Sequence, residues 1–152
     1  MTKTKKGYEL YPLTVAQKFH LYYLPYCPSA AVLNIGTSLT IGTEVDWEVL
    51  RGSINKAYER SEAMRIRFTK DADGTYYQYI VDDTEDRKSR KIDFVDFYGQ
   101  SMEEAENTMR QWTSVPFPFE DSPMTKIVMI RTPDGFNGVY FLGHHMVVDA
   151  KS

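Results

Sequence analysis

The sequence predicts an α+β fold with a mixed, largely antiparallel sheet and helices packed on it. Short segments rich in β-branched residues alternate with amphipathic helical segments. Two turn signals join neighbouring strands as hairpins, and no Gly-rich phosphate loop of a doubly wound sheet is present. The 152 residues fit one domain, and a content of 42% hydrophobic and 14% aromatic residues is enough to build a core.

Three segments carry helix signals. Thr14-Val-Ala-Gln17 has the capping-box pattern, a hydroxyl three residues before a glutamine, and predicts a helix that ends before Pro25. A second helix should begin near Asp46, and apolar residues follow at helical spacing: Leu50, Ile54, Ala57 and Tyr58. Ser101-Met-Glu-Glu104 is another capping box, and the helix after it should bury one face: Met102, Ala105, Met109 and Trp112.

Six strands are expected, at residues 32–41, 64–68, 76–81, 92–97, 126–132 and 136–143. The second and third flank Asp71-Ala-Asp-Gly74, a hairpin signal whose glycine accepts a positive φ. Pro133-Asp-Gly135 joins the last two in the same way. The segment 115–123 contains three prolines and is expected to be irregular, whereas the charged run 82–91 mixes both signs and is interpreted as a solvated loop.

Composition excludes several classes of protein. A net charge of -3 gives no electrostatic reason to expect nucleic acid, which favours clustered basic faces. Cys27 is the single cysteine, so an internal disulfide and a Cys-x-x-Cys zinc site are both excluded. No apolar run approaches the roughly 20 residues that span a bilayer, and the basic start lacks a hydrophobic signal core. A soluble cytoplasmic protein without membrane contact is therefore expected.

The segment His144-His145-Met-Val-Val-Asp149 follows the last strand and is the candidate for chemistry. Neighbouring residues of an extended chain point to opposite faces, so only one of the two histidines can face a given cleft. Three interpretations stay open on these residues alone: two structural histidines, acid–base catalysis by one of them, or a metal site with Asp149. The metal interpretation lacks a third nitrogen or sulfur ligand apart from the distant His20.

Four segments, in order along the chain, resemble the motifs of condensation domains, a branch of the chloramphenicol acetyltransferase-like superfamily. Residues 144–152 resemble the signature His-His-x-x-x-Asp-Gly-x-Ser, and residues 60–68 resemble Arg-His-Glu-x-Leu-Arg-Thr-x-Phe. Residues 13–20 are similar to the opening Ser-x-Ala-Gln segment, and residues 117–124 to Pro-Phe-Asp-Leu-x-x-x-Pro-Leu. Together these matches cover nearly the whole chain.

The resemblance implies a chloramphenicol acetyltransferase-like subdomain. Residues 1–152 would be the N-terminal half of a condensation domain from nonribosomal peptide synthesis, with the C-terminal half absent. The complete domain would transfer an acyl or peptidyl group from one carrier-protein thioester to the amine of a carrier-bound amino acid. Its partners would be the donor and acceptor peptidyl carrier proteins, whose 4'-phosphopantetheine arms hold the substrates, so that no cofactor or metal binds the chain directly.

Residue by residue, the resemblance implies that His145 is catalytic. It would take a proton from the attacking amine, or position that amine and stabilise the charged intermediate. His144 would face the opposite side and support the fold. Asp149 would form an ion pair with Arg65, since an arginine fork binds a carboxylate through two hydrogen bonds. Gly143 would help to shape the pocket.

Departures from the family pattern leave alternatives open. Ala150 stands in place of glycine, Ser61 in place of histidine and Ile66 in place of threonine. A degenerate, non-catalytic module that docks carrier proteins, or a related acyltransferase that uses coenzyme A, would also fit. Asp149-Ala-Lys-Ser152 resembles a helix N-cap, so we expect a truncated piece that self-associates through an apolar face and is inactive alone.

Overall fold

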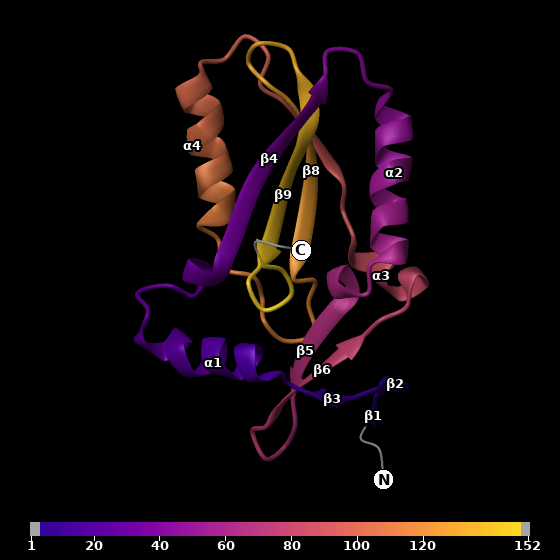
Figure 1. Cartoon of the computed structure of the whole chain (residues 1–152), viewed down its shortest axis with the longest axis vertical. Helices are drawn as coiled ribbons and strands as arrows, with labels where there is room; N and C mark the ends of the chain where they lie inside the picture. Colours follow the sequence, from indigo (N-terminus) through magenta and orange to yellow (C-terminus); the bar gives the residue numbers. More distant parts are fainter. Residues whose placement is uncertain (1–3, 150–152) are drawn as a thin grey trace.

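The computed structural model describes residues 4–149. Its centre is a four-stranded sheet in the order β4-β9-β8-β7 (Figure 1). The strands are β4 (Asn34–Gly42), β9 (Asn137–His144), β8 (Thr125–Arg131) and β7 (Asp93–Asp96). β9 pairs antiparallel with both β4 and β8, whereas β7 pairs parallel with β8. The expected mixed, largely antiparallel sheet is therefore confirmed.

Helices α4 (Met102–Thr113) and α2 (Trp47–Arg60) cover opposite faces of this sheet (Figure 1). Alternation along β8 explains the two layers, because successive side chains of a strand point to opposite faces. Val128 and Ile130 pack with Ala105 of α4, whereas the intervening Ile127 and Met129 pack with α2. Each helix begins at a predicted cap, Asp46 or Ser101.

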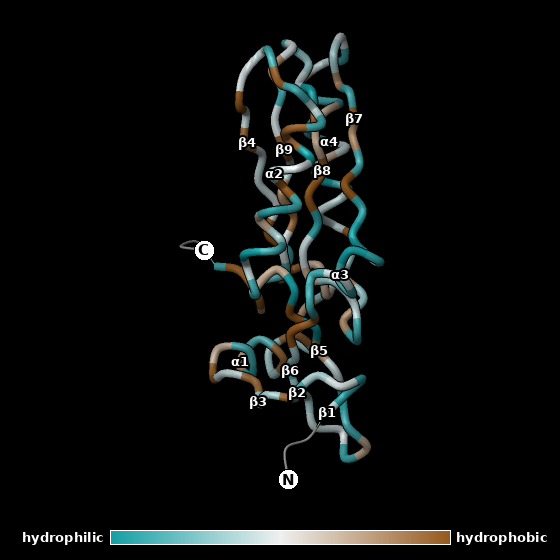
Figure 2. Tube along the Cα trace, turned by 90° about the vertical axis from the view of Figure 1, so that its right-hand side faces the viewer, coloured by the Kyte–Doolittle hydropathy of each residue, from teal (hydrophilic) through white to brown (hydrophobic). Residues whose placement is uncertain are grey.

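A smaller sheet lies below the central one (Figures 1 and 2). It has the order β3-β6-β5, formed by β3 (Tyr11–Pro12), β6 (Tyr76–Ile80) and β5 (Ile66–Lys70). Helix α1 (Val15–Tyr23) lies beside it and begins at the predicted capping box. Leu13, Phe68, Met124 and Met146 form a core that joins this unit to the end of the central sheet. The turn after β9 therefore packs against the small sheet.

The remaining elements are short. The hairpin of β1 (Thr4–Lys5) and β2 (Tyr8–Glu9) was not anticipated, nor were the 3₁₀ turns η1 (Leu24–Tyr26), η2 (Ala30–Leu33) and η3 (Ala63–Arg65). Both predicted strand hairpins form, with positive φ angles of 84° at Gly74 and 91° at Gly135. Ala57 and Met102 lie in the predicted helices, and both are exposed.

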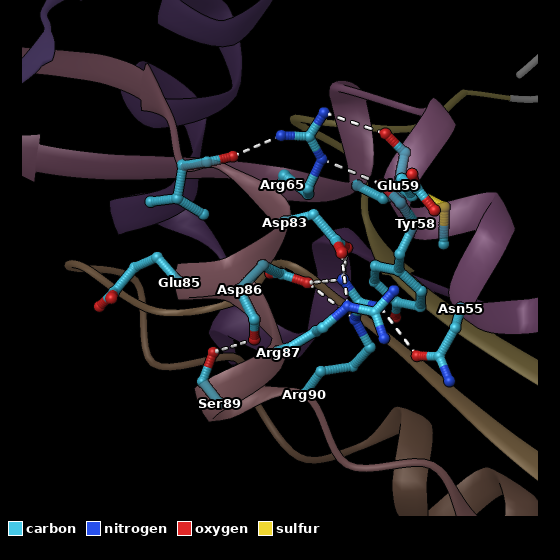
Figure 3. A network of polar contacts seen from close by, with 12 residues as sticks. Asn55, Tyr58, Glu59, Arg65, Asp83, Glu85, Asp86, Arg87, Ser89 and Arg90 are labelled. Carbon is cyan, nitrogen blue, oxygen red and sulfur yellow. Dashed lines mark hydrogen bonds and ion pairs between the residues drawn. The ribbon is translucent and has the colours of Figure 1, made fainter.

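The interpretation of residues 82–91 as a solvated loop was wrong. This segment forms helix α3 (Asp83–Ser89), and Asp86 is only 1% exposed (Figure 3). Its carboxylate accepts hydrogen bonds from Arg67 of β5 and from Arg90, whose Nε lies 2.8 Å away. Arg90 also pairs with Asp83 at 2.7 Å. Charged residues of this run therefore form a buried ion network with Arg67, and the network joins α3 to the small sheet.

Candidate functional site

The histidine pair lies at the end of β9, where the chain turns. The backbone N–H of His144 donates to Met124 O at 2.9 Å and that of His145 donates to Leu33 O at 2.7 Å. The two residues are thereby held by segments on either side, and their side chains diverge: His144 is 3% exposed, whereas His145 is exposed. The chain then reverses, because Val147 N donates back to His144 O at 2.9 Å. The opposite orientations expected from strand alternation are present.

His144 is enclosed by aromatic rings. Phe117 and Phe119 meet its imidazole edge-on, with centroids at 6.2 and 6.0 Å. Its Nδ1 accepts a hydrogen bond from Met146 N at 3.2 Å, which fixes the ring and requires Nδ1 to be unprotonated. Burial, followed by repulsion from His20 and His145, lowers the pKa of His144 to about 4. His144 is therefore neutral at pH 7 and holds the turn that carries His145.

This buried histidine should make folding depend on pH. The pKa of His144 falls from its ordinary value of 6.5 to about 4 on folding, so between these values the unfolded chain binds more protons. Stability is complete above pH 6.5 and is lost as the pH falls toward 4. We expect His144 to contribute a loss of about 3 kcal/mol over that window, measured by urea unfolding at each pH.

A matched variant separates the contribution of His144 to this pH dependence from the contribution of the carboxyl groups. In His144→Asn, the amide oxygen can accept from Met146 N, as Nδ1 does in the wild type, and it does not titrate. The loss of unfolding free energy between pH 6.5 and 4 should therefore be smaller in the variant by about 3 kcal/mol. Parallel pH profiles for the two proteins would contradict the assignment.

His145 faces helix α1. The imidazole centroids of His145 and His20 are 4.6 Å apart, with an interplanar angle of 38°. His20 was not among the predicted site residues and was named only as a distant ligand in the metal interpretation. Its position three residues after Gln17 was the available signal, because that spacing puts both side chains on one helix face. The structure thus brings all three histidines of the sequence together.

Gln17 ties α1 to the same turn. Its side chain completes the predicted capping box by accepting from Thr14 N at 2.9 Å. The Nε2 group also donates to Met146 O at 3.0 Å and to Gln78 at 2.9 Å. The side chain is buried, so these bonds are shielded from water. The capping role expected of Gln17 was therefore only part of its function in the structure.

Gly143 lies directly before the pair, where side chains approach closely. A Cβ at this position would lie 2.8 Å from Val148 Cγ2 and 2.9 Å from the Phe141 ring. Such distances are shorter than ordinary contacts, so a side chain here would displace the turn after His145. Gly143 therefore supports the shape of the turn through its lack of a side chain.

Arg65 follows helix α2, and its predicted ion pair with Asp149 stays a prediction. Its guanidinium donates to three carbonyl oxygens: Tyr58 O at 3.0 Å, Val81 O at 2.5 Å and Glu59 O at 3.3 Å (Figure 3). The last carbonyls of α2 lack helical partners and attract the arginine fork. Arg65 thus anchors α2 to the end of β6.

These contacts leave His145 as the exposed member of the histidine pair. It is exposed, its backbone is fixed on the Leu33 side, and its neighbour is a buried neutral imidazole. An imidazole at the end of a strand can accept a proton from an amine and return it to a leaving group. Within residues 4–149, no group of three or more His, Cys, Asp or Glu side chains is arranged to hold a metal ion. No helix of the described part is long and apolar enough to cross a membrane.

Comparison with known proteins identifies a matching family and similar sequences. The model of the condensation domain family matches residues 8–152. Surfactin synthase subunit 1 of Bacillus subtilis (strain 168) is 25% identical over 154 residues, which cover 93% of this chain and 4% of that protein. Surfactin synthase subunit 2 of the same organism is 26% identical over 145 residues, which cover 95% of this chain and 4% of that protein. The chain therefore spans only a small part of the length of these relatives.

Solved structures share the fold. The first condensation domain of the calcium-dependent antibiotic synthetase, in complex with a substrate analogue, superimposes with a TM-score of 0.80 at 22% identity. The starter condensation domain of rhizomide synthetase gives a TM-score of 0.77 at 17% identity. In both comparisons, 93% of this chain and 34% of the solved chain are covered, so the chain spans about a third of them. The expected chloramphenicol acetyltransferase-like fold is confirmed, and the chain belongs to the condensation domain family.

Proposed function

We propose that residues 1–152 form the N-terminal subdomain of a condensation domain that joins carrier-bound substrates in nonribosomal peptide synthesis. The observation that carries the proposal is the divided histidine pair. His144 is buried and neutral, whereas His145 is exposed on a backbone held by carbonyls that flank β4 and β8. That arrangement presents one imidazole to a substrate and reserves the other for the fold.

The proposed reaction is aminolysis of a thioester. The amine nitrogen attacks the thioester carbonyl, the C–N bond forms, and the carrier thiol leaves as the C–S bond breaks. A proton must leave the nitrogen during this exchange, and the exposed His145 imidazole is the group that would accept it or hold the amine in place. Negative charge on the carbonyl oxygen needs donors as well, and backbone N–H groups are the usual source.

The proposed partners are the donor and acceptor carrier proteins and a C-terminal subdomain. Exposed apolar side chains gather on α1 and η1 and offer a surface for such contacts: Val15, Phe19, Tyr22, Tyr23 and Tyr26. The same surface would allow residues 1–152 to self-associate, since apolar groups exposed together tend to be covered. Phosphopantetheine would reach the site on the carriers and would not be held by this chain alone.

Two departures from the family pattern have a structural setting. Ile66 is half-buried and packs in the core around Phe68, where an apolar side chain is favourable. Ser61 ends helix α2, and its N–H donates to Ala57 O at 3.0 Å. Ala150 lies outside the described residues, as does the expected helix start that follows it. The observed roles of Ile66 and Ser61 do not require loss of activity.

The proposal is tested with a protein that contains residues 1–152 together with a second subdomain. It is mixed with one carrier protein loaded with an acyl or aminoacyl thioester and another loaded with an amino acid, and the amide product is measured by mass spectrometry. Product should form with the complete domain, whereas residues 1–152 alone should give the rate without protein, because neither carrier arm is positioned. A complete domain that binds both carriers without forming product would instead indicate a docking module. Transfer only from free coenzyme A thioesters would favour the coenzyme A-dependent alternative.

A further inference from the structure

The contact between His20 and His145 joins helix α1 to the histidine pair. His20 lies three residues after Gln17, the last residue of the segment that matches Ser-x-Ala-Gln. The ring centroids of His20 and His145 are 4.6 Å apart at 38°, within the range of packed aromatic rings. His20 is half-buried, and His145 is exposed. The contact therefore covers one face of the His145 ring and leaves the rest accessible.

Hydrogen bonds on both sides of His145 fix the position of this ring contact. Gln17 binds Met146 O from α1, so the helix is fixed to the turn on one side of His145. Leu33 O binds the backbone N–H of His145 on the other side. An exposed side chain otherwise changes rotamer on a picosecond to nanosecond scale. A ring held from α1 restricts that rotation.

The surroundings of His20 favour its neutral form. Burial, followed by repulsion from His145, lowers the pKa of His20 below its ordinary value of 6.5. His144, the third histidine of the cluster, has its own pKa lowered by burial and then by His20 and His145. At neutral pH His20 is therefore an uncharged ring, and it does not repel a proton that His145 takes from an amine.

We propose that His20 is a positioning residue for His145, and that its ring holds the His145 imidazole in the orientation that accepts the substrate proton. The proposal rests on the proposed function, because it assumes that His145 acts on an amine. It needs no metal: residues 4–149 contain no group of three or more His, Cys, Asp or Glu side chains arranged around an ion. A purely structural role fits less well, since His20 is only half-buried and contacts the exposed His145 ring.

A first test uses residues 1–152 and does not depend on catalysis. In NMR spectra with labelled histidine, ring protons of His20 and His145 should show a direct nuclear Overhauser contact in the wild type. His145→Phe keeps a ring but removes its charge, so the pKa of His20 should rise toward 6.5 while burial still holds it lower. Absence of the ring contact, or an unchanged His20 titration, would overturn the proposal whatever the activity of the domain.

A second test measures the complete domain with loaded carriers. His20→Ala should lower kcat by about tenfold and leave KM unchanged, because the imidazole is present but less well oriented. His20→Phe should restore most of kcat, since the ring contact is kept without the titrating group. Lys18→Ala is the matched control, with wild-type kcat expected: Lys18 is exposed on the same helix and lies outside the apolar surface of α1 and η1.

The outcomes separate the two proposals. Wild-type kcat in His20→Ala, with activity lost in His145→Ala, would end the positioning role and leave the proposed function standing. Full activity in both variants would contradict the proposed function itself. Equal loss in His20→Ala and His20→Phe would contradict positioning by ring contact.

Discussion

Replacing Asp86 with alanine should lower the free energy of unfolding by about 3–5 kcal/mol, because it leaves buried positive charge without its counter-ion. The side chain of Asp86 is 2% exposed, and those of Arg67 and Arg90 are each 4% exposed. Arg90 would keep Asp83 and the Asn55 amide oxygen at 2.9 Å, and its guanidinium would still lie 4.2 Å above the Tyr58 ring. Arg67 would lose its carboxylate partner. Urea unfolding followed by tryptophan fluorescence measures the change.

An exposed ion pair provides the matched control. Glu106 and Arg110 pair at 3.1 Å on the outer face of α4, with side chains 51% and 72% exposed. Glu106→Ala should change the unfolding free energy by no more than about 0.5 kcal/mol, since water screens such pairs. Similar losses for Asp86→Ala and Glu106→Ala would show that burial of the network does not matter for stability.

A double replacement tests the cause. Arg67→Met combined with Asp86→Ala removes the stranded charge as well as its partner, so it should be less destabilising than the sum of the two single changes. Additive losses would contradict direct coupling through the ion pair. The comparison also separates stranded charge from lost packing, because the methionine retains an apolar stem.

The buried network also marks a limit of sequence reasoning. The run 82–91 places its acidic residues before its basic ones, at spacings that suit a solvated segment as well as a helix. Arg67 decides whether this run is a solvated segment or a packed helix. It lies 19 residues before Asp86 and faces it only after β5 and α3 have formed. Burial of a charge depends on a tertiary partner, and no local pattern contains that partner. By contrast, the capping boxes at Thr14 and Ser101 are local, and both form as predicted.

The features of the candidate site also divide into those set by local sequence and those set by contacts between distant elements. Strand alternation was enough to predict that His144 and His145 diverge, because it depends only on neighbouring residues. The link between Arg65 and Asp149 came from the family resemblance and stays a prediction, whereas the contacts of Arg65 with the last carbonyls of α2 were not anticipated. The approach of His20 to His145 required the position of α1 relative to β9, which the sequence does not encode locally. Contacts between distant elements are thus where the sequence reasoning failed.

Replacing His145 with alanine should lower the rate of condensation by about 10²-fold or more in a complete domain, the usual scale for a positioned acid–base group. The side chain is exposed, and its backbone bond to Leu33 O does not involve the imidazole. The unfolding free energy should therefore change by no more than about 0.5 kcal/mol, as for other exposed positions. Rates are measured with two loaded carriers by quantifying the amide product.

The neighbouring histidine is the matched control for this change. His144→Ala removes a buried ring from between Phe117 and Phe119 together with the acceptor for Met146 N, so it should reduce the yield of folded protein and the unfolding free energy. A folded His145→Ala domain with full turnover would refute the catalytic assignment. A His145→Ala domain as unstable as His144→Ala would also contradict it, since the loss of activity could then be a loss of fold. Only selective loss of turnover at position 145, with stability lost at position 144, agrees with two adjacent imidazoles that face opposite sides of one strand.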